Sequence, residues 1–374
     1  MPDKRDEGVE MVRALTRWQR LGLAVLFVVG VFAVGAGVFV WTGYYNISAK
    51  AQHWDITTEI LETVRDQSIR ARADTVDVPN LDDPDMIALG REHFLGGCSS
   101  CHGLPGEVLN PVISAMLPNP PDLTYAPEHY DAGALFWLID NGIKYTGMPA
   151  WPADNRSDEV WPLVAYLIDL NRRQEESAVI ADRSPDGQPT AEFGFQVLTQ
   201  CSRCHGDAET PPVSALVPEL AGQPVQYLER ALREYRDGIR PSGYMLPAAY
   251  GLTDDDITEL AEYYAGLPPR ASQSSPDPDS IARGGQIAAQ GVPADDVPAC
   301  LSCHGNGNPQ FPELAGQSAR YLESQLELWR GGGRAQTGYG EIMSIVGQRM
   351  SPEQIRDVSA FFASLTPPEA EASQ

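Results

Sequence analysis

The chain has 374 residues, with 51 acidic and 27 basic side chains and a formal net charge of −24. This length accommodates two or three domains. The acidic excess argues against nucleic-acid binding, which needs a basic face, and suits a solvated surface or a partner with a basic docking surface.

An uncharged apolar run extends from Leu21 to Trp41. Its length matches the ~20 residues that cross a bilayer as a helix, whereas the apolar part of a cleaved signal peptide has about 7–15. Basic residues before the run predict a cytoplasmic N-terminus. We therefore expect a cytoplasmic segment at 1–20, a transmembrane anchor at 21–42 and export of the rest. A cleaved signal peptide is the alternative.

The exported part is predicted to be all-α, because no β-strand period stands out. A helix is expected at 54–72, within a stalk and linker that span 43–82. Linkers are also predicted at 174–189 and 272–280, where charged and turn-forming residues cluster. The predicted domains between these linkers are 83–175, 190–269 and 281–367.

Each predicted domain contains one Cys-x-x-Cys-His motif, and the three motifs hold all six cysteines. This motif is typical of c-type haem attachment, in which the thiols bind the haem covalently and the histidine binds the iron. Structural zinc needs four ligands, a thioredoxin-like pair occurs once, and a disulfide framework has no need of the histidine. We predict three covalently bound haem c groups. The attachment cysteines are Cys98, Cys101, Cys201, Cys204, Cys300 and Cys303, and the proximal iron ligands are His102, His205 and His304.

Further motifs carry a family resemblance. Pro-Glu-Leu-Ala-Gly-Gln begins at both Pro218 and Pro312, and each copy is followed by Tyr-Leu-Glu and by a final helix with paired aromatic residues. With Val-Pro-Ala-Cys at 297–300, the last two domains together resemble dihaem c4-type cytochromes. The first domain, with Gly-Met-Pro-Ala-Trp at 147–151, resembles cytochrome domains anchored next to terminal oxidases and periplasmic dehydrogenases. Each unit resembles a class I cytochrome c.

This resemblance implies that a methionine binds the other face of each iron, which raises the potential of the haem. Met148 is the candidate in the first domain, because Met116 follows His102 too closely. Met245 is the candidate in the second domain. His53, His93 and His129 are alternative ligands, with structural or surface roles as the default.

The third domain offers two methionines, Met343 and Met350. Aligning the final helices of the last two domains places Met343 on Met245 and Met350 on a leucine. Met343 is therefore the predicted ligand, and Met350 is a predicted core residue.

The resemblance also implies that a proline carbonyl after each motif accepts a hydrogen bond from the proximal histidine, which orients its ring. Pro218 and Pro312 match this position in the repeats. Pro121 is the less certain match in the first domain.

Two protein ligands on every iron leave no site open for substrate, so we expect an electron carrier that is not an enzyme on its own. The predicted role is to relay single electrons on the periplasmic side of a bacterial inner membrane. The expected partners are a terminal oxidase as acceptor and a quinol-oxidising complex or soluble cytochrome as donor. The alternatives are the cytochrome subunit of a periplasmic dehydrogenase and a haem enzyme with one labile axial site.

Overall fold

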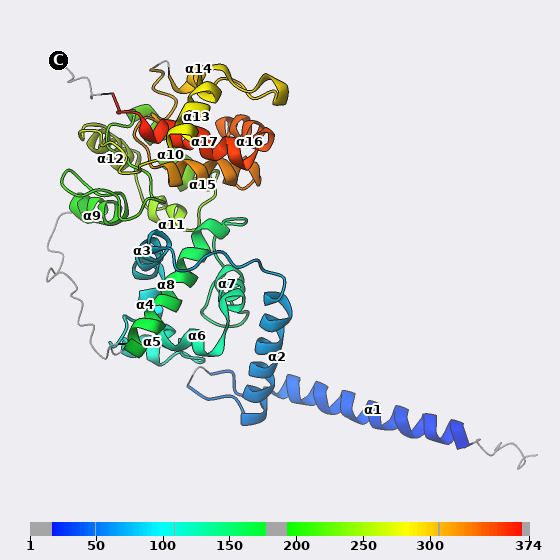
Figure 1. The fold of residues 1–374 in the computed structure, drawn as a ribbon. Coiled ribbons are helices and arrows are strands. Elements are labelled where there is room, and N and C mark those ends of the chain that lie inside the picture. The colour runs from blue at the N-terminus through cyan, green and yellow to red at the C-terminus, as the bar shows by residue number, and fades with distance from the viewer. Residues whose placement is uncertain (1–16, 49, 108, 177–192, 306, 369–374) are drawn as a thin grey trace, which may run out of the picture. The chain divides into compact units, whose positions relative to one another are not determined.

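The protein is mostly helical. The structure, a computed structural model, describes residues 17–48, 50–107, 109–176, 193–305 and 307–368. These residues contain no strand, which confirms the all-α prediction (Figure 1). Most of the predicted segment 1–20 and of the predicted linker 174–189 lies outside the described residues. The chain forms two compact units, residues 1–58 and 59–374.

Helix α1 (Arg17–Thr42) dominates the first unit, and its residues are exposed. Its 26 residues extend about 39 Å at ~1.5 Å per residue, which is enough to cross a membrane. A signal sequence near the N-terminus has the same properties, so α1 fits both interpretations. Beyond α1, the ring of His53 stacks on Tyr45, with 6.1 Å between centroids, which gives this histidine a structural contact.

Helix α2 (Asp55–Ala73) confirms the helix predicted at 54–72. In the second unit, Ile69 and Ala73 near its end are buried together with Ala134. Ile60 and Val64 are exposed, so the apolar residues of α2 are buried only near its C-terminal end.

The second unit contains the three motif-bearing segments, region 1 (83–175), region 2 (190–269) and region 3 (281–367). The helical segments of region 1 are α3 (Pro84–His93), η1 (Phe94–Cys98), α4 (Ser99–His102), α5 (Pro111–Ser114), η2 (Leu123–Tyr125), α6 (Ala126–His129), α7 (Ala132–Asn141) and α8 (Ser157–Glu176). Those of region 2 are α9 (Phe193–His205), α10 (Val225–Arg236), α11 (Met245–Ala249) and α12 (Asp254–Ala265). Those of region 3 are α13 (Pro278–Gln290), η3 (Pro293–Asp295), α14 (Leu301–His304), α15 (Ala319–Arg330), α16 (Gly338–Arg349) and α17 (Pro352–Ser364).

Regions 1 and 3 close in the same way, with the first helix crossing the last. Helix α3 packs on α8 and α13 on α17, as Figure 1 shows. A glycine lies at each crossing, because a Cβ on Gly90 would sit 1.8 Å from the Pro162 carbonyl oxygen and one on Gly284 would sit 1.9 Å from that of Asp357. Because glycine has no side chain, the two helices can approach closely. This close packing holds the motif that follows the first helix against the core.

The last helices of regions 2 and 3 both begin after a hydroxyl side chain that caps them. Thr253 and Ser351 cap α12 and α17 with reciprocal side-chain and backbone hydrogen bonds. The predicted linker at 272–280 is too long, because α13 already begins at Pro278. Asp277 accepts a hydrogen bond from Ser280 N, and proline suits the first helical position, so the helix starts inside the Pro- and Ser-rich stretch.

Regions 2 and 3 meet through their two copies of Pro-Glu-Leu-Ala-Gly-Gln. Gln223 Nε2 donates to the Glu313 carbonyl (2.9 Å), and Gln223 Oε1 accepts from Glu313 N (3.1 Å). Gln317 makes the same two bonds with Glu219, at 2.5 and 3.1 Å. Each motif therefore binds the backbone of the other copy, and we name this contact the glutamine junction.

Region 1 meets region 2 through a buried carboxylate. Glu159 of α8 accepts hydrogen bonds from Ser242 Oγ (2.5 Å), Gly243 N (2.6 Å) and the Trp151 indole (3.0 Å). Arg156 pairs with the same carboxylate at 2.6 Å and donates to the Pro241 carbonyl at 2.5 Å. Burial raises the pKa of Glu159, and the Arg156 charge opposes that shift.

The start of α3 adds further contacts with both other regions. Ser214 of region 2 donates to the Asp85 carbonyl (2.8 Å), and Asp85 Oδ1 accepts from Ala215 N (3.0 Å). Arg320 of region 3 pairs with Asp83 and Asp85. Together with the Glu159 contacts, these form the charged junction.

Candidate functional site

The three Cys-x-x-Cys-His motifs lie on helical turns. The first begins where η1 ends, at Cys98, and continues along α4; the second ends α9; and the third occupies Cys300 and α14. A glycine follows each histidine in the sequence. Gly103 and Gly206 both have φ of 72°, a left-handed conformation that ends the helical turn and sends the chain back past the histidine.

The first cysteine of each motif lies in a buried environment that disfavours the thiolate. Burial raises the pKa of Cys98, Cys201 and Cys300 to about 11 each, whereas redox-active thiols have lowered pKa values. No group of three or more His, Cys, Asp and Glu side chains that could hold a metal ion occurs in the described part of the chain.

All three motif histidines make the predicted contact with a proline carbonyl. The distance from Nδ1 to the carbonyl oxygen is 2.8 Å for His102 and Pro121, 3.2 Å for His205 and Pro218, and 3.1 Å for His304 and Pro312. Because a carbonyl oxygen only accepts, Nδ1 must carry the proton, which leaves the Nε2 lone pair for a metal.

Burial also keeps these rings neutral. It lowers the pKa of His102, His205 and His304, although each bonded carbonyl partly opposes the shift. A neutral imidazole is the form that binds iron. The three motifs thus present three equivalent ligand groups.

One cavity of about 1700 Å³ connects the three motifs. It exceeds the ~300–1000 Å³ of a pocket for a single drug-sized ligand. The predicted attachment and ligand residues lie on its wall, except Cys303, which is exposed. The volume and the mostly apolar wall suit large apolar groups, and the thiols and imidazoles on it suit haem c.

The three predicted methionine ligands are half-buried on the cavity wall. The backbone N–H of Met148 donates to Thr146 Oγ1 (3.1 Å), and that of Met245 donates to Ser242 Oγ (2.9 Å). Met343 lies on α16. Met116 is also on the wall, beside Gly147, so proximity to the cavity alone does not select Met148.

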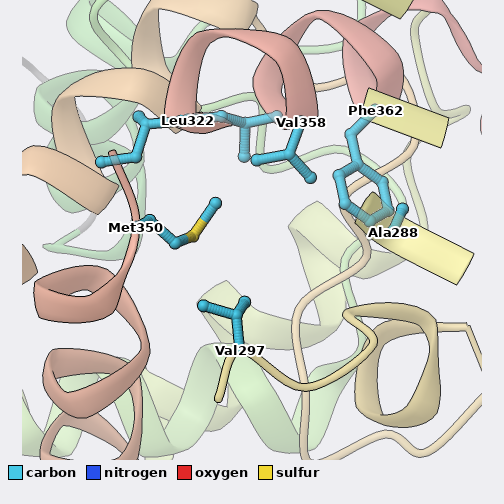
Figure 2. Packing of buried hydrophobic residues seen from close by; sticks show 7 residues of the cluster. Ala288, Val297, Leu322, Met350, Val358 and Phe362 are labelled. Atoms are coloured by element: carbon cyan, nitrogen blue, oxygen red, sulfur yellow. The ribbon is translucent and has the colours of Figure 1, made fainter. Parts of the chain in front are cut away.

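Met350 belongs to the core of region 3, as predicted. It is 3% exposed and packs with Leu322, Val358 and Phe362. Figure 2 shows these side chains around an open space, opposite Val297. Leu252, its aligned counterpart in region 2, is buried as well.

His93 and His129, the other histidines of region 1, also line the cavity. His93 is buried, its Nδ1 is 3.2 Å from the Glu159 carbonyl, and its ring stacks on Tyr244 at 4.5 Å. Burial lowers the pKa of His93 to about 4, so the ring is neutral near pH 7. These contacts agree with a structural role for His93.

Sequence reasoning missed two buried arginines on the cavity wall, Arg240 and Arg334. The repeat contained the signal, because Arg240 follows Tyr227 by the same number of residues as Arg334 follows Tyr321. A basic residue in a polar loop is ordinarily solvated, so only the repetition marks these positions.

Comparisons with known proteins agree with this geometry. The profile of the family described as "Cytochrome C oxidase, cbb3-type, subunit III" matches residues 85–167. Cytochrome c-552 of Acidithiobacillus ferridurans is 33% identical over 48% of this chain and 79% of its own length. The thiosulfate dehydrogenase electron acceptor of Thiomonas intermedia is 36% identical over 44% of this chain and 77% of its own.

Cytochrome c4 of Pseudomonas aeruginosa is 32% identical over 44% of this chain and 83% of its own length. The chain thus belongs to the cytochrome c family, as an electron-transfer protein with covalently bound haem c that is related to the c4-type cytochromes and to thiosulfate dehydrogenase electron acceptors.

Proposed function

We propose that the chain is a membrane-anchored trihaem cytochrome c that relays single electrons on the periplasmic side of a bacterial inner membrane. Regions 1, 2 and 3 are its cytochrome domains, and α1 is its anchor. Each domain holds one haem c through its two motif cysteines. The iron ligands are the motif histidine and Met148, Met245 or Met343.

The observation that carries this proposal is the threefold repetition of one arrangement. In every region a motif histidine donates Nδ1–H to a proline carbonyl, and a methionine lies on the wall of the same cavity. Bound haem supplies one-electron iron chemistry. The residues of the chain fix the imidazole, provide the thioether and exclude water.

The proposed acceptor of the electrons is a terminal oxidase. Electrons from the donor are proposed to enter the chain at the haems of regions 2 and 3. The oxidase-subunit profile matches region 1, and this supports an oxidase beside that region. A second candidate is the cytochrome subunit of a periplasmic dehydrogenase. The relatives named thiosulfate dehydrogenase electron acceptors favour that alternative.

Purification of the full chain in mild detergent tests the proposal. We expect a pyridine haemochrome titration to give three haems per chain, and co-purifying subunits to include a terminal oxidase. A haem count below three contradicts the trihaem assignment. If a dehydrogenase co-purifies and an oxidase does not, the second candidate, the cytochrome subunit of a dehydrogenase, is favoured over the first.

The ligand assignment predicts that Met148→Leu, Met245→Leu and Met343→Leu each lower the potential of a different haem. Leucine keeps the volume but removes the thioether, which stabilises ferrous iron. Redox titration of each variant measures the shift. Met350→Leu is the matched control and should leave all three potentials unchanged, since leucine stands at the equivalent position of region 2.

Binding of carbon monoxide to the reduced protein distinguishes an electron carrier from a haem enzyme. A carrier with two protein ligands on every iron should not bind it in the reduced native state. Binding by one haem would show that this haem has a labile site.

A further inference from the structure

The turn of the second motif lies against region 1, close to the first motif. Cys204 belongs to a buried cluster that includes Leu89 of α3, and Tyr244 packs against this cluster. A Cβ on Gly96, two positions before Cys98, would collide with the Tyr244 hydroxyl group. The backbone that leads into the first motif therefore touches a side chain of region 2.

Three aromatic rings cross the contact between regions 1 and 2. The ring of Tyr244 stacks on that of His93, with 4.5 Å between the ring centres. The His93 ring in turn lies 6.1 Å from the ring of Trp151. Both separations are those of favourable ring contacts. We name Trp151, His93 and Tyr244 together the aromatic bridge.

Each end of the aromatic bridge adjoins a proposed iron ligand. Tyr244 directly precedes Met245 in region 2, and Trp151 follows Met148 by three positions in region 1. The bridge residues and both methionines line the shared cavity. The aromatic bridge thus lies between the methionine loop of region 1 and that of region 2.

Buried polar contacts hold Tyr244 in this position. Arg203, inside the second motif, donates a hydrogen bond to the Tyr244 hydroxyl, and its Nε lies 3.2 Å from Glu92 Oε2 of α3. The Glu92 side chain is 4% exposed. Because a buried carboxylate is unfavourable unless it is paired, this arrangement ties the second motif to region 1 at one defined position.

Region 3 reaches region 1 at a different place. Arg320 pairs with Asp83 and Asp85 at the start of α3, before the first motif. Regions 2 and 3 meet at the glutamine junction, beside the prolines that orient His205 and His304. Contacts beside the motifs thus link region 1 with region 2 and region 2 with region 3.

We propose that the aromatic bridge carries electrons between regions 1 and 2, with Tyr244 as the bridging residue, so that region 2 is the middle carrier of the three. This inference rests on the proposed function, which places a haem in each region. Electron tunnelling weakens steeply with distance and is stronger through contacting atoms than across a gap. One electron passes in each step, no bond forms or breaks, and Tyr244 keeps its proton and stays neutral.

Two substitutions of Tyr244 separate the ring from the hydroxyl group. Tyr244→Leu leaves a gap where the ring lay, so electron transfer between regions 1 and 2 should slow. Tyr244→Phe keeps the ring, so most of the wild-type rate should remain. Tyr250→Leu is the matched control, because it makes the same change in region 2 at a side chain that is 77% exposed.

Flash photoreduction of the full-length holoprotein, followed by time-resolved absorbance, measures these rates. Redox titration of Met148→Leu identifies the potential that belongs to region 1. Hydrogen–deuterium exchange at Ala215, whose N–H donates to Asp85, reports separately whether region 1 stays docked on region 2. We expect slow transfer to region 1 in Tyr244→Leu with unchanged exchange. Transfer as fast as in Tyr250→Leu overturns the inference, and so does equal slowing in Tyr244→Leu and Tyr244→Phe.

A second pair of variants covers the case in which Tyr244→Leu does not fold or loses its docking. His93→Leu and His93→Phe make the same comparison from the region 1 side of the stack. The aromatic bridge requires slow transfer in His93→Leu and faster transfer in His93→Phe, and equal rates in the two overturn the inference. A wild-type haem count below three contradicts the proposed function instead, so the two failures can be distinguished.

Discussion

The glutamine junction and the charged junction join neighbouring regions by different chemistry. In the glutamine junction, Gln223 and Gln317 bind backbone groups of the other copy and no charge is involved. In the charged junction, the contacts involve acidic and basic side chains, among them the buried Glu159 and the half-exposed Arg320. Neutral hydrogen bonds do not respond to pH near neutrality, whereas ion pairs respond to pH and, where exposed, to salt. The hydrogen bonds of the glutamine junction are thus independent of pH near neutrality, whereas region 1 is attached partly by ion pairs that solution conditions can change.

The largest expected effect comes from Glu159→Ala. Its removal leaves the Trp151 indole and Ser242 hydroxyl without their acceptor and takes one of two carboxylates from Arg156. We expect a loss of about 3–5 kcal/mol in the free energy of unfolding, measured by urea titration of the holoprotein. Glu262→Ala, on the exposed face of α12, is the control. A double-mutant cycle with Ser242→Ala should give a coupling energy of about 0.5–3 kcal/mol, and additivity would argue against the contact.

The next effect comes from the glutamine junction. Gln223→Ala and Gln317→Ala each remove two hydrogen bonds, so each should cost about 1–3 kcal/mol. The two costs should be equal, because the bonds are made in the same way from both sides. Urea unfolding measures both, with Gln348→Ala on α16 as an exposed control. A large difference between the two variants would contradict the symmetric description.

A smaller effect is expected for Arg320→Gln. The Arg320 side chain is 39% exposed, so its pairs with Asp83 and Asp85 should contribute about 0–1 kcal/mol. The loss should shrink as salt is added, because exposed pairs are screened. Unfolding at low and high ionic strength measures it. Arg330→Gln, which removes a pair within α15, is the control, and salt-independent loss would point to packing instead.

The smallest expected effect is on how the stability of the fold depends on pH in the acid range. A hydrogen bond from Arg320 lowers the pKa of Asp83 below its usual 3.8, although burial opposes this. A carboxyl with a lowered pKa stabilises the folded state above its unfolded pKa, and this contribution is lost as the pH falls through the folded value. Below about pH 4, the free energy of unfolding should therefore fall less steeply in Asp83→Asn than in the wild type. Urea midpoints between pH 3 and pH 6 test this, and an unchanged profile would exclude Asp83 as its source.

The contiguous motifs were predictable from the sequence because each one is a local arrangement. The Cys-x-x-Cys-His turns and the caps at Thr253 and Ser351 follow from spacing within a short stretch, and the buried Met350 follows from aligning regions 2 and 3. The contact between His102 and Pro121, nineteen positions apart, was implied by the family resemblance, with Pro121 as the less certain match, and the structure contains it.

The junctions could not be predicted in the same way. Glu159 has the sequence position of a solvated acid in the first turn of a helix, yet region 2 buries it. Gln223 binds a backbone group ninety positions away. Such contacts depend on how the regions pack, and no local pattern encodes them. The paired arginines were an intermediate case, because the repetition was visible while the burial was not.

The glutamine junction is a two-fold contact within a single polypeptide, and its surroundings are free to differ. A homodimer must place the same residue on both sides of its axis, because both subunits have one sequence. Here Val217 precedes the proline that orients His205, whereas Phe311 precedes the one that orients His304. The Phe311 ring lies 5.9 Å from the His304 ring. Duplication inside one chain thus permits symmetric docking together with unequal neighbours for the two histidines, and unequal neighbours are what a preferred direction of electron flow requires.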